Sequence, residues 1–265
     1  MRHPITRRIA AAAALSVPLA LAAGTAPASA QPVSGPLSVR LDPLKGSDAS
    51  GTATLTPTGN GGLKVSIHDT GLVPNMPHAQ HIHGDTSGKH FTCPTDAADK
   101  NGDGFISIEE GLPMYGNIHI SLTTKGDTSM KSALAVDRMP VADANGDLNY
   151  QRTLKPSQLP PGTLSHLTDL HIVQHGVDAN GNDKYDLKGL GESTFAKSAG
   201  LKGIPEEATD GATCGMIMPV GSVDTGGAST AGVDHPFVIG AGIAGLIAAG
   251  GLLVIRRRST TSSNR

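Results

Sequence analysis

Short runs of alternating apolar and polar residues, separated by turns, constrain the fold of this chain more than any other feature. The clearest run is residues 63–68, where Leu63, Val65 and Ile67 alternate with polar residues. A period of two is typical of a strand with one buried face. Further strands are expected at 37–41, 52–55, 79–83, 117–123, 148–154, 167–175 and 213–220. Turns rich in glycine and proline connect these runs, so the sequence predicts an all-β sandwich or barrel.

Residues 1–30 have the pattern of a signal peptide. Three arginines, Arg2, Arg7 and Arg8, precede an apolar run, and Ala28-Ser29-Ala30 offers a small-residue cleavage site. The pair Arg7-Arg8 leaves twin-arginine export open as a route. We therefore expect the chain to be exported.

The other end carries an uncharged apolar run at residues 236–255, long enough to span a bilayer as a transmembrane helix. The basic tail at 256–265 would then lie in the cytoplasm. A linker rich in Gly, Ser and Thr, residues 221–235, precedes the run. Around Thr225 this linker resembles part of the sorting signal of wall-anchored bacterial proteins. The folded domain, residues 31–220, would sit on the bacterial cell surface in either case, anchored in the membrane or the cell wall.

Charge and cysteine content limit what the domain can do. The formal net charge of −2 provides no basic field, so we expect no nucleic-acid partner. The two cysteines, Cys93 and Cys214, are expected to pair in an exported protein. Closing so long a loop would stabilise the fold by about 4–5 kcal/mol in the chain-entropy model.

Residues 99–110 match the twelve-residue calcium loop of EF-hand proteins. Calcium takes six to eight oxygen ligands, and alternate residues of a tight loop can supply them. The expected ligands are Asp99, Asn101, Asp103, Ser107 and Glu110, with the backbone carbonyl of Phe105. Pro94 before the loop and Pro113 after it limit the flanking helices. We therefore expect a static, structural calcium ion and not a switch.

Two later fragments resemble the start of this loop. The fragment at Asp143 lacks the glycine and the closing glutamate, so it is interpreted as an ordinary turn. The second fragment is a candidate for a second calcium site, with Asp178, Asn180, Asn182 and Asp186 as its ligands. Gly189 stands where that loop needs its closing glutamate. For this fragment a calcium site and a simple turn remain open alternatives.

Two histidines share one face of a predicted strand. His81 and His83 project to the same side because residues i and i+2 do so in a strand, while Ile82 enters the core. Such a pair can chelate copper or zinc. The candidates for a third ligand are His78, His90, His119, His171 and His175. We favour His175, which ends its strand at an open position beside Gly176, whereas His171 is expected to be packed between apolar neighbours.

Several motifs occur in the order found in the copper–zinc superoxide dismutase family. These are His81-Ile82-His83-Gly84, Cys93, the strand ending in His175, and Cys214-Gly215. From Leu37 to Val220 the chain resembles this family, and chordin-type domains offer a related non-enzymatic comparison. The resemblance implies a Greek-key β-barrel, copper ligands His81, His83 and His175, and a disulfide from a loop to the last strand.

The chain also departs from that family. No histidine lies between Cys93 and Asn117, where the family holds zinc, so we expect no zinc. The calcium loop occupies this stretch instead. Gly211, preceded by Asp210, stands where the family has an arginine that attracts the anionic substrate. A copper site could persist, with His119 or His90 as a fourth ligand.

These departures favour a non-catalytic role over catalysis. The leading hypothesis is a surface-anchored, calcium-binding, dismutase-like domain that binds a metal or a protein partner, whose identity the sequence does not indicate. The alternative is an extracytoplasmic copper-only superoxide dismutase that uses His81, His83 and His175.

Overall fold

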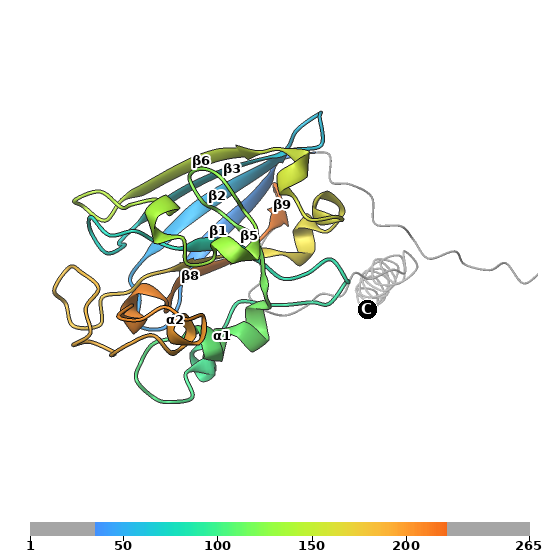
Figure 1. Ribbon diagram of the computed structural model, residues 1–265. Coiled ribbons are helices and arrows are strands. Elements are labelled where there is room, and N and C mark those ends of the chain that lie inside the picture. The colour runs from blue at the N-terminus through green and yellow to red at the C-terminus, as the bar shows by residue number, and fades with distance from the viewer. Residues whose placement is uncertain (1–34, 222–265) are drawn as a thin grey trace, which may run out of the picture.

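A computed structural model describes residues 35–221 of the chain (Figure 1). The predicted signal peptide, most of the linker, the wall-sorting motif and the transmembrane segment lie outside these residues. Within residues 35–221, no helix has the length and apolar character needed to cross a membrane.

The described residues form one curled antiparallel sheet, which confirms the all-β prediction. Its nine strands have the order β5-β4-β7-β8-β1-β2-β3-β6, and β9 also pairs with β1. Their bounds are β1 Leu37–Pro43, β2 Ser50–Pro57, β3 Leu63–Thr70, β4 Gln80–His83, β5 Ile118–Ser121, β6 Leu148–Leu154, β7 His171–His175, β8 Gly211–Met216 and β9 Met218–Pro219. The consecutive strands β1, β2 and β3 lie side by side, and β8, from near the end of the described residues, lies on the other side of β1.

The barrel expected from the sequence is not closed by backbone pairing within the described residues. The end strands β5 and β6 do not pair with each other in the sheet order. Side chains bridge them: Tyr150 and Arg152, both on β6, donate hydrogen bonds to the carbonyl of Thr123, just beyond β5. The sheet therefore curls until its ends meet, and polar side chains link them.

Alternating burial explains why these segments are strands. On β3, Leu63, Val65 and Ile67 are buried, whereas Lys64 between them and His68 after them are exposed. The bounds of β6 agree with the prediction. The strand predicted at 167–175 is shorter, because residues 167–169 form a 3-10 turn that a contact between His166 and Asp169 closes.

Two short helices lie in the loops, α1 (Ile108–Tyr115) and α2 (Thr194–Ser198). Helix α1 starts at a capping box in which the side chains of Ser107 and Glu110 bond reciprocally to backbone N–H groups. It continues through Pro113, further than the sequence indicated. Burial of Tyr115 and a hydrogen bond from the Gly116 N–H to the Leu112 carbonyl hold its last turn.

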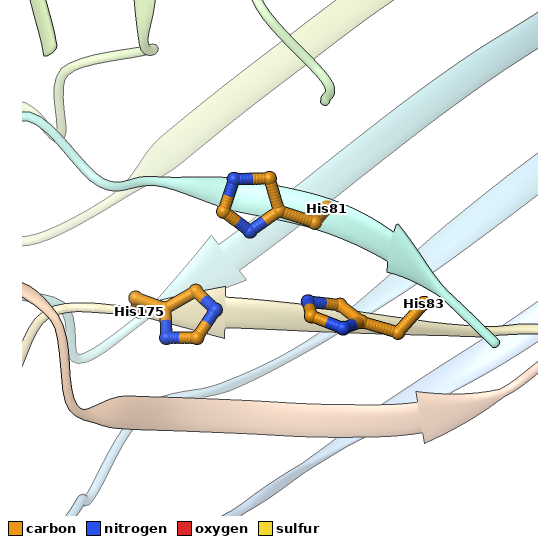
Figure 2. Close-up of side chains that lie close together, drawn as sticks. All are labelled: His81, His83 and His175. Carbon is orange, nitrogen blue, oxygen red and sulfur yellow. The ribbon is translucent and has the colours of Figure 1, made fainter. Parts of the chain in front are cut away.

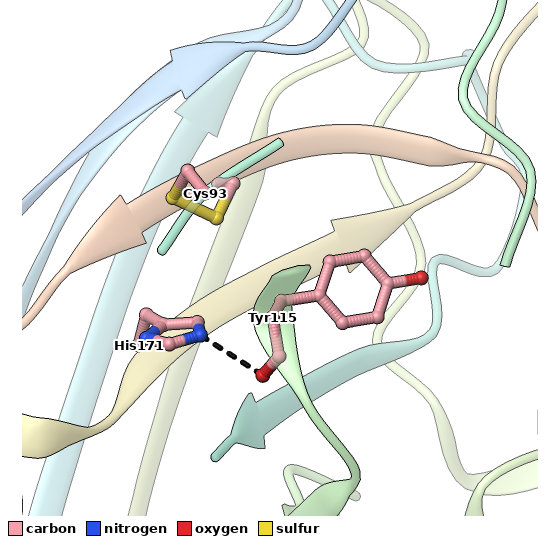
Figure 3. Close-up of a disulfide and its surroundings, with 4 residues drawn as sticks. Cys93, Tyr115 and His171 are labelled. Carbon is pink, nitrogen blue, oxygen red and sulfur yellow. Dashed lines mark hydrogen bonds between the residues drawn. A yellow bond between two sulfur atoms is a disulfide. The ribbon is translucent and has the colours of Figure 1, made fainter. Parts of the chain in front are cut away.

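The predicted disulfide between Cys93 and Cys214 is confirmed. It joins the long loop after β4 to β8, across a sequence separation of 121 residues (Figure 3). Near it, the carbonyl of Tyr115 accepts a hydrogen bond from Nε2 of His171 at 2.9 Å. The loop that carries α1 is therefore fixed to β8 by a covalent link and to β7 by a buried hydrogen bond.

Candidate metal centre

Strands β4 and β7 bring three histidines together. His81 and His83 lie on β4, and His175 ends β7, the neighbouring antiparallel strand. One potential ligand atom of each lies within 4.8 Å of the others (Figure 2). Within residues 35–221, this is the one group of three or more His, Cys, Asp or Glu residues with such a geometry.

Irregular pairing accompanies two of these histidines. The register of β4 against β5 shifts between Ile82 and His83, and that of β7 against β8 shifts between Gln174 and His175. Such irregularities re-aim side chains and are frequent beside functional sites. Ile82, between the two histidines of β4, is fully buried in the core, as the alternation predicts.

A backbone carbonyl orients each imidazole. His81 donates from Nε2 to Ala133 at 3.1 Å, His83 from Nδ1 to Gly116 at 2.9 Å, and His175 from Nδ1 to Thr209 at 2.7 Å. A carbonyl oxygen can only accept, so the proton of each ring is placed on that nitrogen. Metal-binding histidines commonly have their second nitrogen fixed in this way.

The other nitrogen of each ring has no hydrogen-bond partner. These atoms are Nδ1 of His81, Nε2 of His83 and Nε2 of His175, and all three are buried. An unsatisfied buried polar atom costs about 1–3 kcal/mol, so three in one place require an explanation. A metal ion bound to three lone pairs would satisfy all of them.

Burial keeps the three rings neutral. Desolvation, followed by the charge of His175, lowers the pKa of His81 to about 3. Burial likewise lowers the pKa of His175 to about 4 and that of His83 well below its ordinary value. Neutral imidazole is the form that binds metal, so these ligands are ready at neutral pH.

The structure does not bring the other candidate histidines to this centre. His119, one of the two candidates for a fourth ligand, bonds through Nε2 to Oγ1 of Thr163 at 2.8 Å. His78 contacts two backbone carbonyls, and His90 is exposed. The expectation of an open position for His175 is wrong, because its side chain is 1% exposed. Loops that cover the end of β7 account for this burial.

A cavity of about 510 Å³ adjoins the three histidines. Its walls come from α1, the segment 130–135 and α2, and they are mostly apolar. Among its lining residues, Lys131 carries the one formal charge. Asp210, whose charge was expected from the sequence to disfavour an anionic substrate, does not line the cavity. Burial, with a further contribution from Glu206, raises the pKa of Asp210 to about 9, so its carboxyl is uncharged at neutral pH.

The predicted calcium loop has the hydrogen bonds of a tight turn. The carboxylate of Asp99 accepts from the N–H groups of Gly102 and Gly104, and it also pairs with Lys45 at 2.6 Å. The carboxylate of Glu110 accepts from Lys100 with one oxygen and from Ser107 with the other. The acidic groups of the loop do not converge as the three histidines do.

Glu207 was not among the calcium ligands predicted from the sequence. Its Oε1 accepts from Ala179, position two of the loop at 178–189, and its Oε2 accepts from Asp186, position nine. Glu110 bonds in the same way to positions two and nine of its own loop. The Glu207 carboxylate fills the space that a side chain at Gly189 would take. That glycine at position twelve was the only signal available in the sequence.

Comparisons with known proteins give limited information. No family model matches the chain. No curated protein matches it either. Among solved structures, it is similar to a mutant form of superoxide dismutase 5 of Candida albicans, with a TM-score of 0.37 and 16% identity over 74% of this chain and 99% of that chain. The copper(II) form of that protein gives a TM-score of 0.35 and 17% identity over 74% and 97%.

Proposed function

We propose that the domain binds one copper ion through His81, His83 and His175. The observation that supports this is the convergence of three buried, neutral imidazoles, each with one nitrogen oriented by a carbonyl and the other without a partner. Imidazole suits copper and zinc, and copper(II) binds more tightly than zinc at a given site of this type.

The number of ligands favours a reactive centre over a structural one. Structural metal sites are usually closed by four protein ligands, whereas reactive sites leave a position open. Here three histidines face a cavity, and no fourth His, Cys, Asp or Glu of residues 35–221 joins their group. Bound copper would supply one-electron redox chemistry at that open position.

Copper loading tests this proposal directly. The purified domain should take up about one copper(II) per chain, and its electron paramagnetic resonance spectrum should show nitrogen ligands. His81→Ala, His83→Ala and His175→Ala should each lose the bound copper, and His119→Ala should retain it. Circular dichroism checks that each variant is folded. Unchanged copper content in the three folded variants would contradict the proposal.

Superoxide dismutation is the reaction we propose for this centre. Two superoxide ions and two protons would give dioxygen and hydrogen peroxide, with the metal returned to its starting state. Lys131 supports this candidate because it supplies a cation at the cavity that can attract an anionic substrate, although Gly211 stands where an arginine was expected. Lys131→Gln should lower the rate and its dependence on salt, whereas Lys125→Gln, an exposed lysine outside the cavity, should not. Stoichiometric copper without any dismutation would instead favour the non-catalytic binding role.

We also propose calcium binding at the loop 99–110, and at the loop 178–189 with Glu207 as its closing carboxylate. The support is the hydrogen-bond scheme that the two loops share at positions one, two and nine. Lys45 would have to move from Asp99, since an ammonium group and a calcium ion compete for the same oxygen.

The location of the domain is likewise a proposal. A disulfide is typical of an oxidising compartment, which agrees with export by a signal peptide at residues 1–30. Fractionation of cells that produce the full chain would test anchoring by residues 236–255 or near Thr225. Release of the domain into the medium would contradict it.

A further inference from the structure

We propose that the cavity over the three histidines binds a small aromatic molecule that carries one anionic oxygen, such as an aromatic carboxylate or a phenolate. Its oxygen would occupy the open metal position, and its ring would contact the apolar walls. This inference rests on the proposed metal function and names the class of ligand that the same site would accept.

The size of the cavity exceeds what a diatomic substrate needs. Its volume is about 510 Å³, within the range of about 300–1,000 Å³ typical of small-molecule sites. A single water occupies roughly 30 Å³ in the liquid, and superoxide is of similar size. A molecule with one or two rings would fill this space, whereas superoxide would leave most of it to solvent.

The walls are apolar although they reach the surface. Seven large hydrophobic side chains are exposed within residues 35–221, and three of them line this one cavity: Leu112 at 36%, Met130 at 60% and Leu201 at 40%. Clustered exposed hydrophobic side chains mark interaction sites, whereas scattered ones do not. The cavity therefore has an apolar rim as well as apolar walls.

Two wall residues favour an aromatic ring over an aliphatic chain. Phe195 on α2 offers an aromatic face or edge, with a preferred pairing at ring separations of about 4.5–7 Å. Met130 adds a thioether, and sulfur–aromatic contacts are favourable by about 0.3–1.5 kcal/mol. Leu134 is a further apolar residue of the lining.

Charge determines the polar part of the ligand. Lys131 is a cation, and the residues that line the cavity include no aspartate or glutamate. A metal ion bound by His81, His83 and His175 would add further positive charge beside Lys131. A single anionic oxygen complements both charges, whereas a cationic ligand would be repelled.

Titration of the zinc-loaded domain tests the inference, because zinc holds the site without redox chemistry. The probes are 1-naphthoate, acetate, which keeps the anion without the rings, and 1-naphthylmethanol, which keeps the rings without the charge. Isothermal titration should show that 1-naphthoate binds at least tenfold more tightly than either. On the copper-loaded domain, 1-naphthoate should also shift the visible absorption of the metal.

Matched variants locate the contact. Phe195→Ala should weaken 1-naphthoate about tenfold, and Leu187→Ala, at an exposed leucine outside the cavity, should not. Lys131→Gln should weaken 1-naphthoate and leave 1-naphthylmethanol unchanged, with Lys125→Gln as the control. All these variants should retain stoichiometric metal.

Three outcomes would overturn the inference: equal binding of 1-naphthoate and acetate, equal binding of 1-naphthoate with and without metal, or a dimer that Phe195→Ala dissociates. The last would show that a second copy of the chain covers the cavity. Metal content is measured separately, so failure of the metal proposal would be recognised on its own. The preference of the cavity for aromatic over non-aromatic probes can still be measured on the metal-free domain.

Discussion

The backbone N–H of Gly211 donates a hydrogen bond to the carbonyl of Ile106 at 2.9 Å. Ile106 is position eight of the loop 99–110, and Gly211 opens β8, two residues after the carbonyl of Thr209 that orients His175. From the other end of the loop, α1 leads to Gly116, whose carbonyl orients His83. Two of the three histidines thus depend on backbone that adjoins this loop.

Calcium should therefore strengthen copper binding as well as the fold. We expect calcium to raise the midpoint of thermal unfolding and to raise copper affinity several-fold, because an ordered loop holds both carbonyls in place. Glu110→Gln should abolish both effects, and Glu109→Gln should preserve them. Calorimetry and a copper competition titration, each with calcium and with chelator, measure this. Identical results in both conditions would contradict the coupling.

Glu207→Gln should destabilise the fold by about 1–3 kcal/mol, since a buried carboxylate that accepts two backbone N–H groups would be lost. If Glu207 closes a calcium loop, the variant should also bind fewer calcium ions per chain than the wild type. Glu192→Gln, an exposed glutamate that accepts one backbone N–H, is the control. Equilibrium unfolding and calcium analysis give the two readouts, and unchanged calcium content would restrict Glu207 to a structural role.

Replacement of Tyr115 should weaken copper binding through His83. The two rings pack with centroids 4.6 Å apart, and Tyr115 is 1% exposed. Tyr115→Ala should cost about 3–5 kcal/mol of stability and leave His83 loosely held. Tyr115→Phe keeps the ring and should keep copper affinity. A copper affinity of Tyr115→Phe as low as that of Tyr115→Ala would show that the hydroxyl, and not ring packing, is what matters.

Asp69 should make stability depend on pH. Burial raises the pKa of Asp69 from 3.8 to about 7, and its carboxyl oxygens have no hydrogen-bond partner. Between pH 3.8 and about pH 7, the folded state therefore holds one proton more than the unfolded state. Its stabilising effect is complete below pH 3.8 and is lost as the pH rises through about 7. Asp69→Asn should therefore gain stability over the wild type by about 1–4 kcal/mol more at pH 8 than at pH 4, since one pKa unit corresponds to about 1.4 kcal/mol. Urea unfolding at both pH values measures the free energy of unfolding of each protein. An equal change in that free energy between pH 4 and pH 8 for the two proteins would disprove this.

The disulfide should contribute a large part of the stability. Loss of the bond between Cys93 and Cys214 should lower the free energy of unfolding by about 4–5 kcal/mol in the chain-entropy model. The double variant Cys93→Ser, Cys214→Ser and the reduced wild type should agree. If reduction leaves the unfolding midpoint unchanged, the loop is held by noncovalent contacts alone.

The sequence predicted the strands and side-chain faces that depend on local periodicity. The alternation around Ile82 correctly placed His81 and His83 on one face, and the pattern at 148–154 gave the bounds of β6. The sequence also predicted that His171 and His175 do not share one ion, because residues four apart on a strand lie far from each other. His171 indeed does not join the group of three histidines. His119, which the sequence offered as a fourth ligand, lies outside the three-histidine group, since its position depends on how β5 meets the turn that contains Thr163.

Contacts between distant segments could not be predicted from one sequence. The carbonyls that orient the three rings lie 33, 34 and 52 residues away from their histidines. Every residue has a backbone carbonyl, so no sequence motif identifies the ones that accept these hydrogen bonds. Glu207 was missed for a similar reason, because it reaches its loop from a separate turn.

Because main-chain carbonyls orient all three imidazoles, no point substitution can delete the groups that set their tautomers. Only a change in the path of the backbone can do so. The metal centre therefore tolerates divergence in the residues around it but is sensitive to insertions and deletions near Gly116, Ala133 and Thr209. In distant relatives, conserved lengths of these three loops would indicate a retained metal centre more reliably than conserved amino acids within them.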